Sequence, residues 1–290
     1  LVPAPNYGCV PQPFFTTNKK CLFVAKFTNA GVYQWAFGYG GSDDCSSQDL
    51  AVSSTGVYVV GSFRGTANFG TGNIVCGNAA NTDGYFAKYS PLTGAPVFVK
   101  HYTDLPGSNA SDHTMQCVTV DAVGNVVVGC QFLFACRVVG VIDLVVPPPG
   151  GNANMSIIKY NDFGNLVWSR LFSTSGDGPR LQRVCIDSQG SVIFNGEINA
   201  AMDFGNGVFD QGLGGNDVML VKLNAGGTLQ WAFRGGPFGD TSECVCVHPS
   251  TREIFIFGTN GSTSGLNLRA QTVLATTGTL NNCFWAKVAP

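Results

Sequence analysis

Short apolar segments alternate with polar, glycine-containing turns along the whole chain, and no stretch of useful length has helical periodicity. The phrase from Phe23 to Trp35 contains an apolar segment, a turn at Gly31 and a second segment that ends on an aromatic residue. Strand-length segments between Gly, Asn and Asp turns predict antiparallel β-strands. Versions of this phrase return along the chain, so we expect a protein built from β-repeats.

A lysine that closes an apolar segment marks each repeat, and the five copies follow one another at spacings of 62, 71, 63 and 65 residues. After the first four copies come a glycine turn, an aromatic residue, an Asp and two further apolar segments. Each unit therefore contains about four strands. The lysines are Lys26, Lys88, Lys159, Lys222 and Lys287, the turn glycines Gly31, Gly94, Gly164 and Gly226-Gly227, and the aromatic residues Trp35, Phe98, Trp168 and Trp231.

Four antiparallel strands per unit are typical of a β-propeller blade, and parallel β-helix repeats are much shorter. The sequence predicts an all-β fold, a β-propeller of four or five blades built from four-stranded antiparallel repeats of about 62–71 residues. We expect a Pro-rich N-terminal segment that contributes terminal strands or none, and then one propeller domain. These parts are 1–20 and 21–290, with repeat units at about 21–82, 83–152, 153–216 and 217–282 and a partial unit at 283–290.

The strand count leaves three arrangements open, because five lysine-bearing strands stand against four copies of every other strand. One is a four-bladed ring with one strand left over. Another is a five-bladed ring in which residues 7–38 form a reduced blade. In the third, the surplus strand completes a neighbouring subunit, and this pairing would propagate head to tail.

The order of the motifs carries a resemblance. The motifs follow one another as an apolar strand with Ala-Lys, a Gly turn, Trp, Gly-Gly, Asp, Gly-Val-Tyr-Val-Val-Gly and Phe-Gly. This order resembles that of the SBBP-type β-propeller repeats, and the resemblance covers about residues 21–288. The second unit departs from the pattern, because Phe98 replaces Trp and an insertion spans Cys130 to Gly151. The resemblance implies a blade scaffold in a secreted or cell-surface protein. It implies no catalytic residue set.

Composition narrows the classes of partner. Charged residues make up 12% of the chain and the formal net charge is -2, against about 25% charged residues in ordinary soluble domains. We expect no nucleic-acid partner, since no basic run occurs, and no membrane span, since no apolar run is long enough. A weakly charged surface suits a protein covered by glycans or by other subunits.

Cysteine usage indicates an oxidising compartment, because 11 cysteines are many for a cytosolic chain and none forms a CxxC pair. The first residue is Leu1, which fits a mature secreted chain, although another boundary would look the same. The disulfide candidates are Cys130 with Cys136, Cys9 with Cys21, and Cys21 with Cys283. The N-glycosylation candidates are Asn109, Asn154 and Asn260, all in predicted loops.

Two residue sets are candidates for metal or ligand binding. Asp44, Asp112, Asp177 and Asp240 recur once per unit and suggest either a calcium or sugar site or, as we prefer, a cap on the turn before the inner strand. Cys244, Cys246 and His248 alternate along one strand and suggest a metal site. Against this, Cys246 is equivalent to Ala51, Thr119 and Cys185, which favours a buried, inert thiol. We expect no cofactor.

Repetition also suggests structural roles. We expect the repeating aromatic residue to pack between blades, and the repeating lysine to keep its amine in water. Three histidines, His101, His113 and His248, follow no catalytic order, and His113 is expected in a loop beside Asp112.

The function predicted from the sequence is that of a non-catalytic extracellular structural protein. It would assemble with itself, through propeller edges or exchange of a terminal strand, into a filament, sheath or surface layer. The alternative is a secreted lectin-like module that binds carbohydrate between blades. A glycoside-active enzyme is third, because such a site needs two or three carboxylates and the inner strands offer only Asp49.

Overall fold

A computed structural model of the chain describes residues 19–145, 154–174, 178–205, 216–235, 239–261, 266–268, 271–274 and 282–288. The chain is all-β, as predicted, and forms several small antiparallel sheets. Within these ranges there is no helix that is long and apolar enough to cross a membrane.

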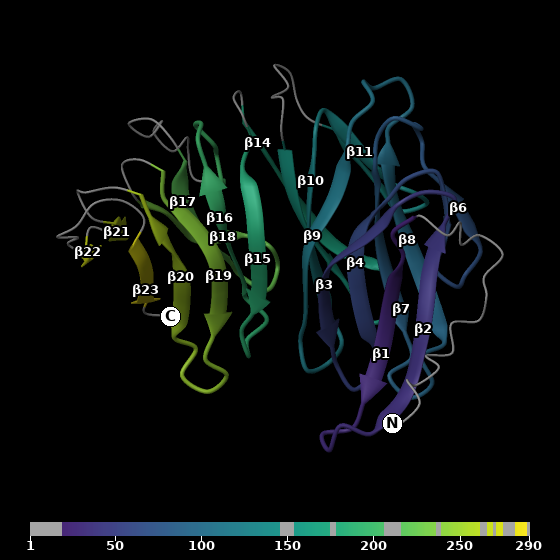
Figure 1. Cartoon of the computed structure of the whole chain (residues 1–290). Helices are drawn as coiled ribbons and strands as arrows, with labels where there is room; N and C mark the ends of the chain where they lie inside the picture. The colour runs from purple at the N-terminus through teal and green to yellow at the C-terminus, as the bar shows by residue number, and fades with distance from the viewer. Residues whose placement is uncertain are drawn as a thin grey trace.

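The described strands form five sheets that follow one another along the chain, and a separate short hairpin (Figure 1). We number the sheets in chain order. Sheet 1 has the order β1 (Leu22–Phe27), β2 (Tyr33–Gly41), β5 (Thr66–Asn68) and β6 (Asn73–Val75). Sheet 2 has the order β3 (Cys45–Val52), β4 (Val57–Phe63), β7 (Asp83–Tyr89), β8 (Pro96–Asp104), β11 (Ala135–Val138) and β12 (Ile142–Val145).

The other three sheets repeat the same arrangement of consecutive antiparallel strands. Sheet 3 has the order β9 (His113–Val120), β10 (Val126–Phe132), β13 (Asn154–Tyr160) and β14 (Leu166–Ser173). Sheet 4 has the order β15 (Arg180–Ile186), β16 (Val192–Ile198), β17 (Asp217–Leu223) and β18 (Leu229–Gly235). Sheet 5 has the order β19 (Thr241–Val247), β20 (Ile254–Asn260) and β23 (Asn282–Val288). The separate hairpin consists of β21 (Leu266–Leu268) and β22 (Gln271–Leu274).

The repeat predicted from the sequence is confirmed at the level of strands. Each repeating lysine lies one residue before the end of a strand, on β1, β7, β13, β17 and β23. The insertion between Cys130 and Gly151 is less irregular than expected, because it contains β11 and β12. These two strands, like β5 and β6, form a hairpin that pairs with the outer strand of the preceding sheet. Each of these two connections therefore ties its own unit to the previous one.

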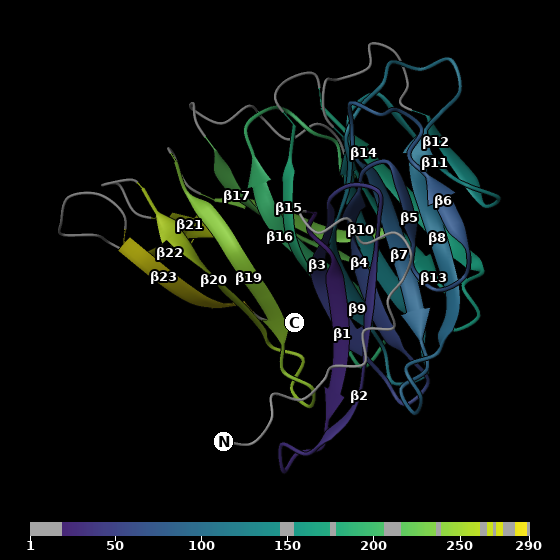
Figure 2. The ribbon, with the colours of Figure 1, turned by 45° about the vertical axis from the view of Figure 1, so that its right-hand side comes forward.

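The first strands of sheets 2 to 5 form an inner row. Strands β3, β9, β15 and β19 contact one another in this order, and Figure 1 shows them side by side across the molecule. Turning the view by 45° shows the other strands of each sheet extending away from this row (Figure 2). The inner row therefore places the turns that follow its strands close together at one end.

The hydrophobic core lies between successive sheets. Four clusters of buried side chains fill the spaces between sheets 1 and 2, 2 and 3, 3 and 4, and 4 and 5. Strands such as β7 and β17 are buried at every residue, because their two faces pack against different neighbours. This explains their nearly continuous apolar sequence.

The repeating aromatic residue packs between sheets, as predicted, and its partner is the turn glycine of the next sheet. Trp168 of sheet 3 covers Gly227 of sheet 4, where a Cβ atom would lie 2.8 Å from Trp168 Cδ2. The indole Nε1 also donates a hydrogen bond to the Ala225 carbonyl at 2.9 Å. Trp35 covers Gly94, and Phe98 covers Gly164.

The prediction that the repeating lysine keeps its amine in water is wrong for Lys88, Lys159 and Lys222, which are buried, whereas Lys287 is exposed. Lys88 Nζ donates to the carbonyl and the carboxylate of Asp162 in the next sheet, at 2.8 and 2.6 Å. A buried ammonium group needs such acceptors, since desolvation without them is costly. The amine of Lys88 therefore lies between the two sheets, where these acceptors are.

We expect the turn glycines to tolerate alanine unequally. Gly31 and Gly227 both have a positive φ, +76° and +80°, but only Gly227 lies under an aromatic ring. Gly31→Ala should lower the free energy of unfolding by about 1–2 kcal/mol, the cost of a left-handed alanine. Gly227→Ala should lower it by about 1–3 kcal/mol more, because the methyl group overpacks against Trp168. Urea unfolding of both variants measures the difference, and equal losses would refute the packing role of Trp168.

The tie between Lys88 and Asp162 predicts a pH-dependent loss of stability. Burial tends to raise the pKa of Asp162, but hydrogen bonds from Lys88, Tyr58 and Thr55 outweigh it and lower the pKa. The contribution of the pair is therefore complete above the unfolded pKa of about 4 and is lost as the pH falls through the lower folded pKa. Lys88→Met should cost about 1–3 kcal/mol near neutral pH, and less in acid.

A matched control is Lys26→Met. Lys26 Nζ donates to the Pro91 carbonyl at 2.7 Å, and this acceptor does not titrate. The cost of Lys26→Met should stay the same between neutral and acid pH. Chemical unfolding of both variants at several pH values makes the comparison, and parallel curves would show that Asp162 is not the titrating partner.

Candidate functional site

The repeating aspartates cap backbone groups. Asp44 and Asp112 accept the N–H groups of Lys20 and Thr82, at 2.9 and 2.7 Å. Both donors lie just before the lysine-bearing strand of the preceding sheet, so each carboxylate joins two sheets. Asp240 is fully buried and accepts the N–H of Gly261 at 2.9 Å, and Asp177 lies outside the described residues. The three described carboxylates thus accept backbone N–H groups, but these donors lie in other segments and not in the turn before the inner strand, where the cap was expected.

The residues of the suggested metal site do not converge. Cys244 and Cys246 are exposed on β19, and Cys246 is therefore not the buried thiol that its place in the repeat predicted. His248 lies in the following turn, where Nδ1 accepts the N–H groups of Ser250 and Thr251. In the part of the chain that the structure describes, no three His, Cys, Asp or Glu residues are arranged to hold a metal ion.

The cysteine pairs proposed from the sequence are not bonded in the described residues. Cys130 and Cys136 are both buried free thiols and lie in the same core cluster between sheets 2 and 3. Cys283 is exposed on β23, whereas Cys21 precedes β1 at the other end of the row of sheets. Cys9 lies outside the described residues.

The three sequons differ in exposure. Asn109 is exposed in a loop, as expected for an acceptor. Asn154 was predicted in a loop, but it is the first residue of β13 and is buried, with its Nδ2 3.5 Å from the Phe134 carbonyl. Asn260 is the last residue of β20, not part of a loop. Of the two sequons whose side chains are described, only Asn109 presents an amide that a glycan could reach in the folded chain.

A buried polar cluster joins β7, β8 and β9. His101 Nε2 lies 2.7 Å from Asp83 Oδ2, and His113 Nδ1 lies 3.9 Å from Asp83 Oδ1. Burial tends to raise the pKa of Asp83, but the hydrogen bonds that it accepts from His101 and from the Gly77 N–H lower it. His113 begins β9 and is buried, so the expectation of a loop position is wrong. No motif in the sequence indicates this cluster, because its members come together only across paired strands.

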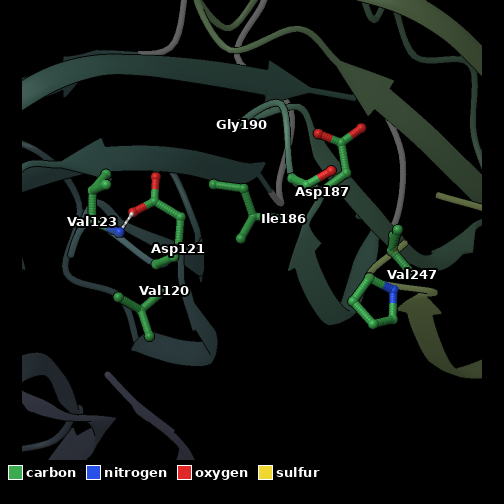
Figure 3. A pocket seen from close by; sticks show the side chains of 10 residues that line it. Val120, Asp121, Val123, Ile186, Asp187, Gly190 and Val247 are labelled. Atoms are coloured by element: carbon green, nitrogen blue, oxygen red, sulfur yellow. Dashed lines mark hydrogen bonds between the residues drawn. The ribbon is translucent and has the colours of Figure 1, made fainter. Parts of the chain in front are cut away.

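A pocket of about 360 Å³ opens where the turns after β9, β15 and β19 meet. Its apolar wall consists of the last residues of these three strands, Val120, Ile186 and Val247, as Figure 3 shows together with two carboxylates. Asp121 Oδ1 accepts the N–H of Val123 at 3.1 Å, and Asp187 Oδ2 lies 3.4 Å from Lys222 Nζ. The volume is at the small end of ligand pockets, which span about 300–1,000 Å³.

The two carboxylates of this pocket accept hydrogen bonds within their own turns, Asp121 Oδ1 from the Asn125 N–H at 2.8 Å and Asp187 Oδ1 from the Ser191 N–H at 2.9 Å. The described residues that line the pocket include no aromatic ring on which a sugar could stack.

Large apolar side chains are exposed on the two terminal sheets. Phe23 and Phe27 project from β1, and Phe257 and Trp285 form a cross-strand pair between β20 and β23. Exposed apolar patches of this kind mark interaction surfaces. Sequence reasoning noticed the unmatched strand at Cys283–Val288 but not these faces, because the same residue types at the same repeat positions are buried elsewhere.

Comparison with known proteins adds no assignment. No protein-family model matches the chain, and no curated protein matches its sequence.

Thiol reactivity should separate the two groups of cysteines. Burial raises the pKa of Cys130 to about 12 and also raises that of Cys117, and the thiolate is the reactive form. In dilute native protein at mildly alkaline pH, iodoacetamide should modify Cys244 and Cys283 and spare Cys117 and Cys130. In denaturant all four should react, which peptide mass spectrometry can check. Fast native labelling of Cys117 would contradict the burial of the inner sheets.

Proposed function

We propose that the five sheets are the blades of a β-propeller-type scaffold of four or five blades, related to the SBBP-type repeats. The support comes from the repeat itself and from the packing. Inner strands β3, β9, β15 and β19 contact one another in series, and each sheet packs its faces against its neighbours in chain order. These are the features of blades arranged about a common axis.

We infer that the scaffold is a non-catalytic extracellular structural protein that assembles with copies of itself. One observation carries this proposal: sheets 1 and 5 each leave an aromatic face open to water. Phe23 is 73% exposed and Trp285 is 70% exposed, whereas the equivalent strands β7, β13 and β17 of the sheets between are buried at every residue. Soluble monomers rarely expose contiguous apolar patches, and a low net charge does little to keep copies apart.

Other features agree with an extracellular setting. The chain contains many cysteines for its length, and Asn109 presents an accessible sequon. The lectin alternative has less support, because the described repeating aspartates bind backbone groups. The enzyme alternative relied on Asp49, which accepts the Val118 N–H at 3.0 Å and lies 3.4 Å from Arg183 Nη1. Through these contacts Asp49 connects the inner strands β3, β9 and β15.

The test is the state of the chain in solution. The purified 290-residue chain should shift from monomer to larger species as its concentration rises, because apolar association is driven by mass action. Sedimentation velocity measures the shift, and electron microscopy shows whether the larger species are ordered filaments or sheets. A compact monomer at every concentration would rule out the proposed function.

A further inference from the structure

We propose that the exposed faces of sheets 1 and 5 are the two halves of a single kind of contact, which two copies of the chain make head to tail. This inference rests on the proposed self-assembly and names the surfaces that would carry it. We call the face that packs against the preceding sheet the front face, and the face that packs against the following sheet the back face. Sheets 1 and 5 are the first and the last in the series of sheets that pack on one another, and Figure 1 shows sheet 5 on the left and β1 and β2 of sheet 1 on the right.

The back face of sheet 5 departs from the other sheets in exposure. The residue two positions before each repeating lysine points to the back face and contacts the next sheet in sheets 1 to 4. There it is at most 5% exposed, but in sheet 5 it is Trp285, at 70%. The five equivalent residues are Val24, Phe86, Ile157, Leu220 and Trp285.

The front face of sheet 1 shows the complementary departure. The residue after each repeating lysine is at most 7% exposed in sheets 2 to 5, but in sheet 1 it is Phe27, at 48%. The residue three positions before the lysine is at most 1% exposed in sheets 2 to 5, but in sheet 1 it is Phe23, at 73%. Two positions that a preceding sheet would cover are therefore open on sheet 1.

The turn of sheet 1 also lacks the partners that the equivalent turns have. Nothing in the described chain lies within 4 Å of a Cβ built on Gly31, whereas Gly94, Gly164 and Gly227 lie under aromatic rings of the preceding sheet. Lys26 and Lys88 each donate to the second residue of the next sheet's turn, Pro91 and Asp162. Lys287 Nζ donates to Glu253 Oε1 at 2.9 Å within the chain, and on this pattern it would also donate to the Asn29 carbonyl of the next copy.

The partner that covers each open face is a second copy of the chain, because consecutive sheets inside the chain already make contacts of this kind. Four contacts inside the chain join a back face to a front face, and the two open faces are of these two kinds. Both are exposed within the same molecule, so in this structure they do not cover each other. Two unlike surfaces that join head to tail give a heterologous contact, which extends as a fibre unless it closes into a ring.

Two blocked variants test this contact. A front-blocked chain carries Phe23→Glu and Phe27→Glu, and a back-blocked chain carries Trp285→Glu and Phe257→Glu. A charge in either face should prevent the contact, because an unpaired charge cannot be buried there. The matched control is Phe163→Glu, since Phe163 is an exposed aromatic residue in a turn of sheet 3. Thermal unfolding followed by circular dichroism shows that each variant is folded, and Trp285→Ala serves if a charged variant is not.

Each blocked variant should remain a monomer where the wild type and Phe163→Glu assemble. A mixture of the two variants should form a one-to-one dimer and nothing larger, because only one intact front face and one intact back face remain. Cys244 and Cys283 share the back face with Trp285, so iodoacetamide should label them more slowly in the mixture than in either variant alone.

Three results would overturn the inference. A front-blocked chain that dimerises by itself would show back-to-back pairing. Wild-type assembly that both blocked variants retain would place the contact elsewhere and leave the proposed function intact. A monomeric wild type in which Cys244 and Cys283 are protected would show that the chain closes on itself, and the proposed function would then fail as well.

Discussion

The packing of one sheet face against the next is the interaction on which the rest of this structure depends. Strands that are buried on both sides need a neighbour on each side, so no single sheet of this chain is stable alone. Burying a large apolar side chain contributes about 1.5–3 kcal/mol. Each space between sheets contains many such side chains, and the cores of the four spaces therefore outweigh the hydrogen bonds of any one hairpin.

The same packing explains why a lysine and a glycine can recur inside an apolar core. The turn glycine lets an aromatic ring of the preceding sheet lie flat on the backbone, as Trp168 does on Gly227. The lysine ends in the same space and must find an oxygen there, because an unpaired buried ammonium group is costly. Lys26 uses a carbonyl and Lys88 a carboxylate. The acceptor differs from unit to unit, although the need for one is constant.

The sequence predicted whatever the repeat determines locally. The spacing of Lys26, Lys88 and the later copies located the strands, and the turn glycines located the hairpins. The predictions that failed concern burial, which depends on the neighbouring sheet and cannot be derived from the periodicity of the sequence. Cys246 was expected in the core because Cys185 is its equivalent, but sheet 5 has no described sheet behind it. Asn154 and His113 were expected in loops, and pairing across strands draws both into the interior.

Strand β23, which was expected to lack a partner, pairs with β20 along one edge, and the question is whether a further partner would bind its other edge or its face. Backbone groups on an open edge can bind water, so pairing them contributes only about 0.5–1.5 kcal/mol for each hydrogen bond. Hydrogen bonds to water cannot compensate for the exposed apolar surface of Trp285 or Phe257. Burying an aromatic ring therefore contributes more free energy of association than pairing one backbone group. A strand that adds to the edge of β23 would leave this face open. Packing of a front face on it would remove the larger apolar surface from water, and for this reason the proposed contact between copies uses the face and not the edge.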